Sequence, residues 1–127
     1  MKNGWLHSWL VAQVVAWVER RGATARQEAP APGGGFIDVL VTLIEVRLAV
    51  EVEVSTPRRA AHGVGKAIRA RCTGLLVVTP TRGTAQIATR SLARTSVPGL
   101  RQRVVPYGLA ECALAQLLNA PRETKNQ

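Results

Sequence analysis

Three carboxylates occur within stretches of sequence that are otherwise aliphatic. Asp38 lies in the apolar stretch 36–43, and Glu51 and Glu53 lie at alternate positions of the apolar stretch 48–55. Both stretches have the composition of β-strands, where an unpaired buried carboxylate is costly. A divalent cation with oxygen ligands removes that cost and the repulsion between the acids. The acids therefore predict a metal site, although a solvated polar face on an edge hairpin is an alternative interpretation.

The two stretches are expected to pair as a hairpin. No Gly, Pro, Asn or Asp occurs in residues 39–54, so the turn has no strong signal. Its tip is expected at Glu45 and Val46, which places Asp38 opposite Glu53, and Leu40 opposite Glu51. Opposed residues in such a pair have Cβ atoms roughly 5 Å apart. The three carboxylates would then crowd one patch.

A basic helix is expected directly after the acids, from Thr56-Pro57 to about Arg71. On a helical wheel one face carries a stripe of cationic residues, namely Arg58, Arg59, His62, Lys66 and Arg69. The chain has 17 Lys and Arg against 8 Asp and Glu, a net charge of +9. This balance favours a polyanionic partner. A solvated basic face in an arginine-rich protein is the alternative interpretation.

The remaining sequence predicts one α/β domain over residues 1–121 and a flexible tail over residues 122–127. The expected order is helix, strand, strand, helix, strand, helix, short strand, helix, over residues 5–21, 36–43, 48–55, 56–71, 74–79, 81–95, 101–105 and 108–119. A strand–helix–strand crossover implies some parallel pairing, with helices covering the sheet. Residues 23–35 contain two prolines and three consecutive glycines and are expected to form a loop.

The first helix bears on location and assembly. Its apolar run is too short and too interrupted to span a bilayer, and charged residues argue against a signal peptide. We expect a cytoplasmic protein without a membrane segment, and the tryptophans of this helix suit a homodimer contact. Cys72 and Cys112 lie far apart in apolar helical patterns and are expected to be reduced core residues.

The acids and the basic helix together resemble the PD-(D/E)XK nuclease superfamily, which includes Holliday-junction resolvases and many restriction endonucleases. The resemblance covers roughly residues 10–80 and lies in Ile37-Asp38, in Glu51-Val52-Glu53 and in the following helix with Lys66. It implies a restriction-endonuclease-like core, a small mixed central sheet flanked by helices in an αβββαβ-like order. It also implies Mg²⁺ or Mn²⁺ bound by Asp38, Glu51 and the Val52 carbonyl, with Glu19 as an auxiliary ligand. Glu53 replaces the lysine of the family motif, and Lys66 would stand in for that lysine.

The resemblance implies metal-dependent hydrolysis of DNA phosphodiester bonds, directed by DNA structure or by a partner. Glu53 or Lys66 would position or deprotonate the attacking water. Phosphates would be held by the basic residues Arg58, Arg59, His62, Arg69 and Arg82. Two other functions fit the same sequence: a nuclease-derived DNA-binding module without catalysis, and an assembly protein whose acids form only a solvated strand face.

Overall fold

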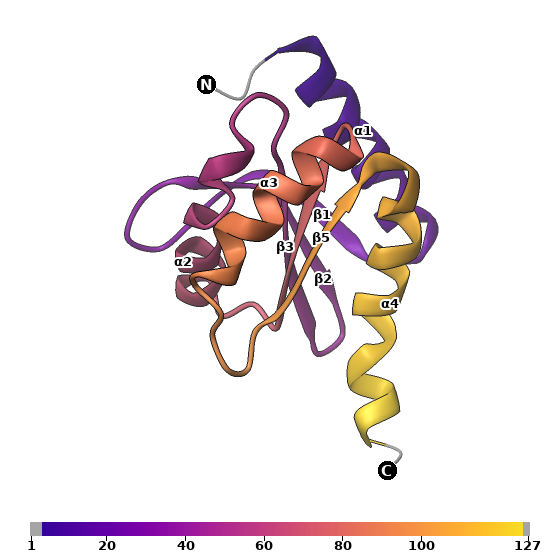
Figure 1. The fold of residues 1–127 in the computed structure, drawn as a ribbon. Helices are drawn as coiled ribbons and strands as arrows, with labels where there is room; N and C mark the ends of the chain where they lie inside the picture. Colours follow the sequence, from indigo (N-terminus) through magenta and orange to yellow (C-terminus); the bar gives the residue numbers. More distant parts are fainter. Residues whose placement is uncertain (1–3, 126–127) are drawn as a thin grey trace.

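A mixed five-stranded sheet lies between two layers of helices (Figure 1). The computed structural model describes the backbone of residues 4–125 and the side chains of residues 4–119. Its elements are α1 (Trp5–Arg20), β1 (Thr24–Pro30), β2 (Phe36–Leu43), β3 (Val46–Val52), the 3₁₀ turn η1 (Pro57–Arg59), α2 (His62–Arg69), β4 (Gly74–Thr79), α3 (Arg82–Ala93), β5 (Arg101–Pro106) and α4 (Tyr107–Lys125). The expected α/β class and mixed sheet are therefore confirmed.

The sheet combines an antiparallel half and a parallel half. Its spatial order is β1-β2-β3-β4-β5. The β1–β2 and β2–β3 pairs are antiparallel, whereas β3–β4 and β4–β5 are parallel. Strand β3 is shared by the two halves, and the helical crossover that follows it contains η1 and α2. Strand β5 lies at an edge, as its terminal Pro106 predicts.

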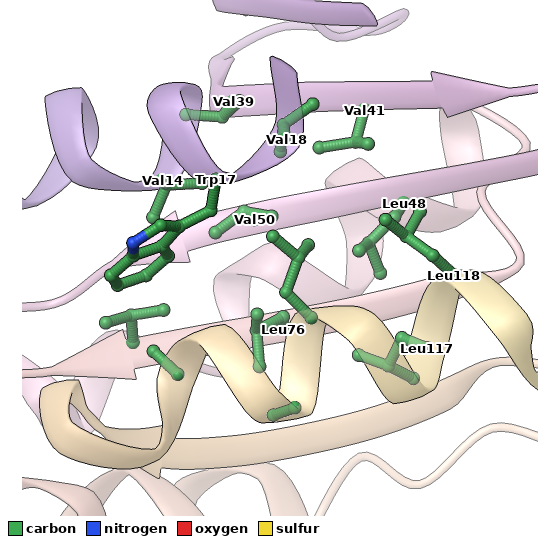
Figure 2. Close-up of a cluster of buried hydrophobic side chains, with 14 of the residues drawn as sticks. Val14, Trp17, Val18, Val39, Val41, Leu48, Val50, Leu76, Leu117 and Leu118 are labelled. Atoms are coloured by element: carbon green, nitrogen blue, oxygen red, sulfur yellow. The ribbon is translucent and has the colours of Figure 1, made fainter. Parts of the chain in front are cut away.

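Each face of the sheet has its own apolar core. On one face, α1 and α4 pack over β-strand residues such as Val39, Val50 and Leu76 (Figure 2). On the other face, alanine-rich surfaces of α2 and α3 pack against Ala49, Leu75 and Val77. The small alanine side chains allow close approach of these helices to the sheet. The sheet interior is therefore shielded from water on both sides, which explains the continuous apolar run of β4.

The hairpin turn lies one residue earlier than the sequence predicts. Leu43 pairs with Val46, so the tip is Ile44-Glu45. Leu40 pairs with Ala49 rather than with Glu51, which makes the predicted register wrong by two residues. Ile44 has φ 52°, a left-handed conformation that β-branched residues rarely adopt. An apolar residue in this position gives no sequence signal for the turn.

Strand β1 occupies much of the segment that was expected to be a loop. Its sequence is polar because it is an edge strand, with Ala29 as its buried residue. It is held by pairing along β2, from Thr24 with Thr42 to Pro30 with Phe36. Apart from Ala23, only the segment 31–35, with its consecutive glycines at positive φ, remains a loop. This strand forms because it pairs with β2, and the local composition of residues 24–30 gives no signal of that pairing.

Other boundaries also differ from expectation. The helix predicted from 56 to 71 is divided into η1 and α2. Helix α4 continues to Lys125, beyond the helix end expected at residue 119, and the flexible tail predicted for residues 122–127 stays a prediction. A proline removes one helical hydrogen bond and bends a helix without always ending it. Residues 126 and 127 lie outside the described residues.

Both cysteines are free thiols, as expected, but only one is partly buried. Burial raises the pKa of the Cys72 thiol, and the positive charge of Arg47 opposes that increase. Cys112 is exposed on α4, so its assignment to the core was wrong. Among the described residues, no helix has the length and apolar character needed to cross a membrane.

Candidate active site

The backbone ladder between β2 and β3 ends at the Val39–Val50 pair, and two carboxylates extend the pairing beyond it. The Asp38 Oδ2 atom accepts a hydrogen bond from the Val52 N–H at 2.7 Å. The Asp38 N–H in turn donates to Glu51 Oε2 at 2.9 Å. Where the two strands separate, each carboxylate is therefore bonded to the backbone of the other strand. The metal site predicted for this pair stays a prediction.

Strand β2 also changes face at Asp38. Ile37 packs in the core beneath α2 and α3, whereas Val39 packs in the core beneath α1 and α4. Residues two apart on a regular strand would share one face. The Asp38 side chain between them is 11% exposed and reaches the β3 backbone. The irregularity therefore leaves this carboxylate between the strands.

Lys66 contacts Glu51 from α2, in the helix layer that also contains α3. Asp38, Glu51 and Lys66 are called the acidic cluster below. Its Nζ atom forms an ion pair with Glu51 Oε1 and donates to the Phe36 carbonyl oxygen at 2.8 Å. Glu51 is only 2% exposed, so this cation offsets much of the cost of burying its charge. A Cβ added to Gly63 would lie 3.1 Å from Glu51 Cγ. Glycine at that position therefore lets α2 lie directly against the acid.

His7 is a site residue that the sequence did not reveal. From α1, its Nε2 atom lies 3.4 Å from Asp38 Oδ2. This nitrogen is buried and has no hydrogen-bond partner within the part of the chain that the structure describes. A cavity of about 300 Å³ opens beside it and is lined by residues 4–7 and 54–56. The sequence gives no local signal that the start of α1 packs against the end of β2.

Glu53 belongs to a neighbouring contact. It is 3% exposed, and its N–H continues the ladder to the Val78 carbonyl oxygen at 2.9 Å. Its Oε1 atom accepts a hydrogen bond from Thr56 Oγ1 at 3.1 Å. Glu53 is therefore buried immediately after β3, with one carboxylate oxygen bonded to the segment that leads into η1.

Glu19 lies away from the cluster. It is exposed near the C-terminal end of α1, whereas His7 lies near the N-terminal end. A helix rises by about 1.5 Å per residue, so the two positions are about 18 Å apart along the axis. The helix residue that faces Asp38 is His7, and the position of Glu19 does not fit an auxiliary ligand.

The residues of the predicted basic stripe do not form one continuous surface, because they make different contacts. Lys66 contacts Glu51, as described above. Arg69 donates hydrogen bonds to the carbonyl oxygens of Pro32 and Gly34, so it holds the loop before β2. Arg58 and His62 line an open cavity between η1, α2 and α3. Two further predicted phosphate contacts, Arg59 and Arg82, are exposed, with Arg82 at the start of α3.

The metal-ligand side chains of residues 4–119 do not by themselves form a complete set of ligands. Within residues 4–119, no three His, Cys, Asp or Glu side chains converge closely enough to hold a metal ion between them. The cluster offers paired donors instead: Asp38 with His7, and Asp38 with Glu51 through the strand backbone. A metal at this place would need the Val52 carbonyl or water to complete its coordination.

Comparison of the chain with family models, with curated proteins and with solved structures found no match. Chemical interpretation of the site therefore depends on its residues and their geometry.

Proposed function

We propose that this protein is a metal-dependent nuclease that hydrolyses DNA phosphodiester bonds, with Asp38 and Glu51 as the metal-binding carboxylates. The observation that carries this proposal is their convergence at the end of the β2–β3 ladder, each bonded to the backbone of the other's strand. A helix, three strands, a helix and a strand precede α3. This order agrees with the αβββαβ-like core that the resemblance to PD-(D/E)XK nucleases implies.

The unpartnered nitrogen of His7 supports a metal at this place. Oxygen and nitrogen ligands of one divalent ion lie at about 2.0–2.2 Å from it, so two adjacent ligands are roughly 3.0–3.5 Å apart. His7 Nε2 and Asp38 Oδ2 are 3.4 Å apart, and that nitrogen makes no hydrogen bond within the described residues. We propose Asp38, Glu51, the Val52 carbonyl and His7 as ligands, with His7 in place of Glu19. The three side chains do not converge on one point among the described residues, so metal binding requires them to move closer together. Either Mg²⁺ or Mn²⁺ suits such a mainly oxygen-donating set.

A bound divalent ion would polarise a phosphoryl oxygen and lower the pKa of a coordinated water. Lys66 contributes a positive charge beside Glu51 and is held by the Phe36 carbonyl. This placement suits the role of the absent motif lysine in orienting the water or stabilising negative charge. Glu53 is one residue beyond Val52 and remains the alternative group for positioning that water. The cavity beside His7 provides space for the substrate.

A structural role for the acids is the main competing interpretation. Each carboxylate accepts a backbone N–H, so the pair also closes the end of the hairpin without any metal. A DNA-binding module without catalysis or an assembly protein would need no more than this. The high positive charge favours the nucleic-acid functions over the assembly protein. A homodimer also remains a prediction, for which the exposed Trp5 and Trp9 on α1 provide an apolar surface.

The decisive experiment compares wild-type protein with Asp38→Asn on labelled duplex and branched DNA in Mg²⁺ or Mn²⁺. Asparagine retains an oxygen that accepts the Val52 N–H but loses the negative charge. We expect cleavage to fall at least about 100-fold, the effect of removing one electrostatic group from an active site. Glu19→Gln is the matched control and should cleave like wild type. Equal cleavage by Asp38→Asn and wild type, with both proteins folded, would exclude the proposed site.

A further inference from the structure

An open groove lies between the start of α2 and the outer side of α3. Its volume is about 580 Å³, and it is lined by Arg58, Ala61, His62, Ile87, Arg90, Ser91, Arg94 and Thr95. Arg90 of α3 and Arg94, which caps the C-terminal end of that helix, were not predicted as site residues from the sequence. They are four residues apart, so they lie on the same face of that helix.

Hydrogen bonds through Ser91 fix the two walls of this groove. The Ser91 hydroxyl donates to the Arg58 carbonyl oxygen at 2.7 Å and accepts the Ala61 N–H at 3.2 Å. One side chain of α3 therefore holds both the end of η1 and the start of α2. These hydrogen bonds fix the position of the Arg58 backbone relative to α3.

The lining carries one sign of charge. It includes three arginines and a histidine but no acidic residue. Arg58, Arg90 and Arg94 are all exposed, so their mutual repulsion is reduced by water but not removed. Three guanidinium groups around one concavity attract an anion and can bind its oxygen atoms in pairs.

The groove borders the candidate active site along α2. His62 lines the groove, and Lys66, which pairs with Glu51, is one helical turn later on the same side of α2. Residues four apart on a helix have Cβ atoms about 5–6 Å apart. The groove and the acidic cluster therefore share α2 as a common wall.

We propose that this groove binds the phosphodiester backbone of the DNA substrate. The inference rests on the proposed function in taking DNA as the polyanion. The lining contains no Phe, Tyr or Trp, and three of its side chains are guanidinium groups, which match phosphate oxygens. The contact is therefore made to phosphates and does not depend on base sequence.

The test measures DNA binding in EDTA, where no divalent ion is available and cleavage cannot occur. Anisotropy of a fluorescent 20-base-pair duplex is recorded between low and physiological salt for wild type and for Arg90→Gln/Arg94→Gln. The control is Arg26→Gln/Arg101→Gln, which removes the same charge from exposed arginines on strands β1 and β5. Thermal melting verifies that each variant is folded.

We expect the groove variant to bind at least about tenfold more weakly at physiological salt than wild type. Its slope of log affinity against log salt should fall by about 2, since each lost phosphate contact contributes roughly 0.9. The control should change the affinity less than about threefold by the weaker, long-range effect of net charge. Equal losses in the two variants, with equal slopes, would overturn the assignment of the groove.

The outcomes separate this inference from the proposed function. Loss of binding in the groove variant supports the groove even if wild type never cleaves DNA. Loss of cleavage in Asp38→Asn, together with groove and control variants that bind equally, would retain the nuclease and overturn the groove.

Discussion

The acidic cluster and the basic groove both border α2, but their charged groups have different surroundings. Glu51 is buried, and its oxygens are bonded to Lys66 and to the Asp38 N–H. The arginines of the groove are exposed and have like charges as neighbours. A buried charge requires its specific partners, whereas exposed charges interact weakly and are screened by salt.

The two regions should therefore differ in how well they tolerate substitutions. Removing one member of the cluster leaves another buried charge without compensation, so effects there are large and depend on one another. Removing one groove arginine weakens attraction for a polyanion but leaves the fold and the other arginines intact. We therefore expect coupled effects in the cluster and additive effects in the groove.

The largest effect is expected for Lys66→Met, which removes the cation from the buried Glu51. Loss of one partner of a buried ion pair costs about 3–5 kcal/mol, and the 17% exposure of the Lys66 side chain places the expected loss near the lower end. Urea unfolding measures the change. Arg59→Met removes an exposed cation nearby and should change stability by less than about 0.5 kcal/mol.

The double variant Glu51→Gln/Lys66→Met tests the coupling. Glutamine keeps an oxygen for the Asp38 N–H but carries no charge, so most of the lost stability should return. If the double variant is instead less stable than Lys66→Met by the full cost of Glu51→Gln alone, the two residues are independent and the cluster does not behave as one unit.

A smaller effect is expected for metal binding when His7 is replaced. His7→Ala should weaken Mn²⁺ affinity at least about tenfold, the low end of what altered metal-site groups cause. Glu19→Gln should bind Mn²⁺ like wild type. Calorimetric titration measures both affinities, and the rise of melting temperature with Mn²⁺ concentration provides a second reading. Unchanged affinity in His7→Ala would remove His7 from the ligand set.

The smallest effects are expected for single arginines of the groove. Arg90→Gln and Arg94→Gln should each weaken DNA binding about threefold, and their losses should add within about 0.5 kcal/mol in the double variant. Both variants should melt like wild type because the side chains are exposed. A loss confined to one arginine, with the other neutral, would narrow the binding surface to that end of the groove.

The sequence predicted the elements whose patterns are local. The run Gly74–Thr79 became β4 because its apolar composition suits a strand covered on both faces. Thr81 begins α3 with a capping box to Thr84, a signal contained within four residues. Asp38 and Glu51 were identified for the same reason, since acids within apolar strands are visible without knowledge of the fold.

Elements made by distant partners were missed or misplaced. Strand β1 is polar and exists through its pairing with β2. The hairpin tip contains Ile44 in a left-handed conformation, which no residue preference predicts. His7 meets Asp38 only because α1 packs across the sheet, and Glu19 is excluded by that same packing.

The sequence by itself determined that this protein buries acids in a sheet beside a basic helix, because composition and spacing fix which side chains are available. Tertiary structure decided which of them meet. In the folded protein Lys66 pairs with Glu51, and His7 lies beside Asp38. Arg69 is bonded to the loop before β2, and Arg58 lines one groove with Arg90 and Arg94. The physical reason is that charge interactions depend on distance and burial, and both are fixed by packing between segments far apart in the chain.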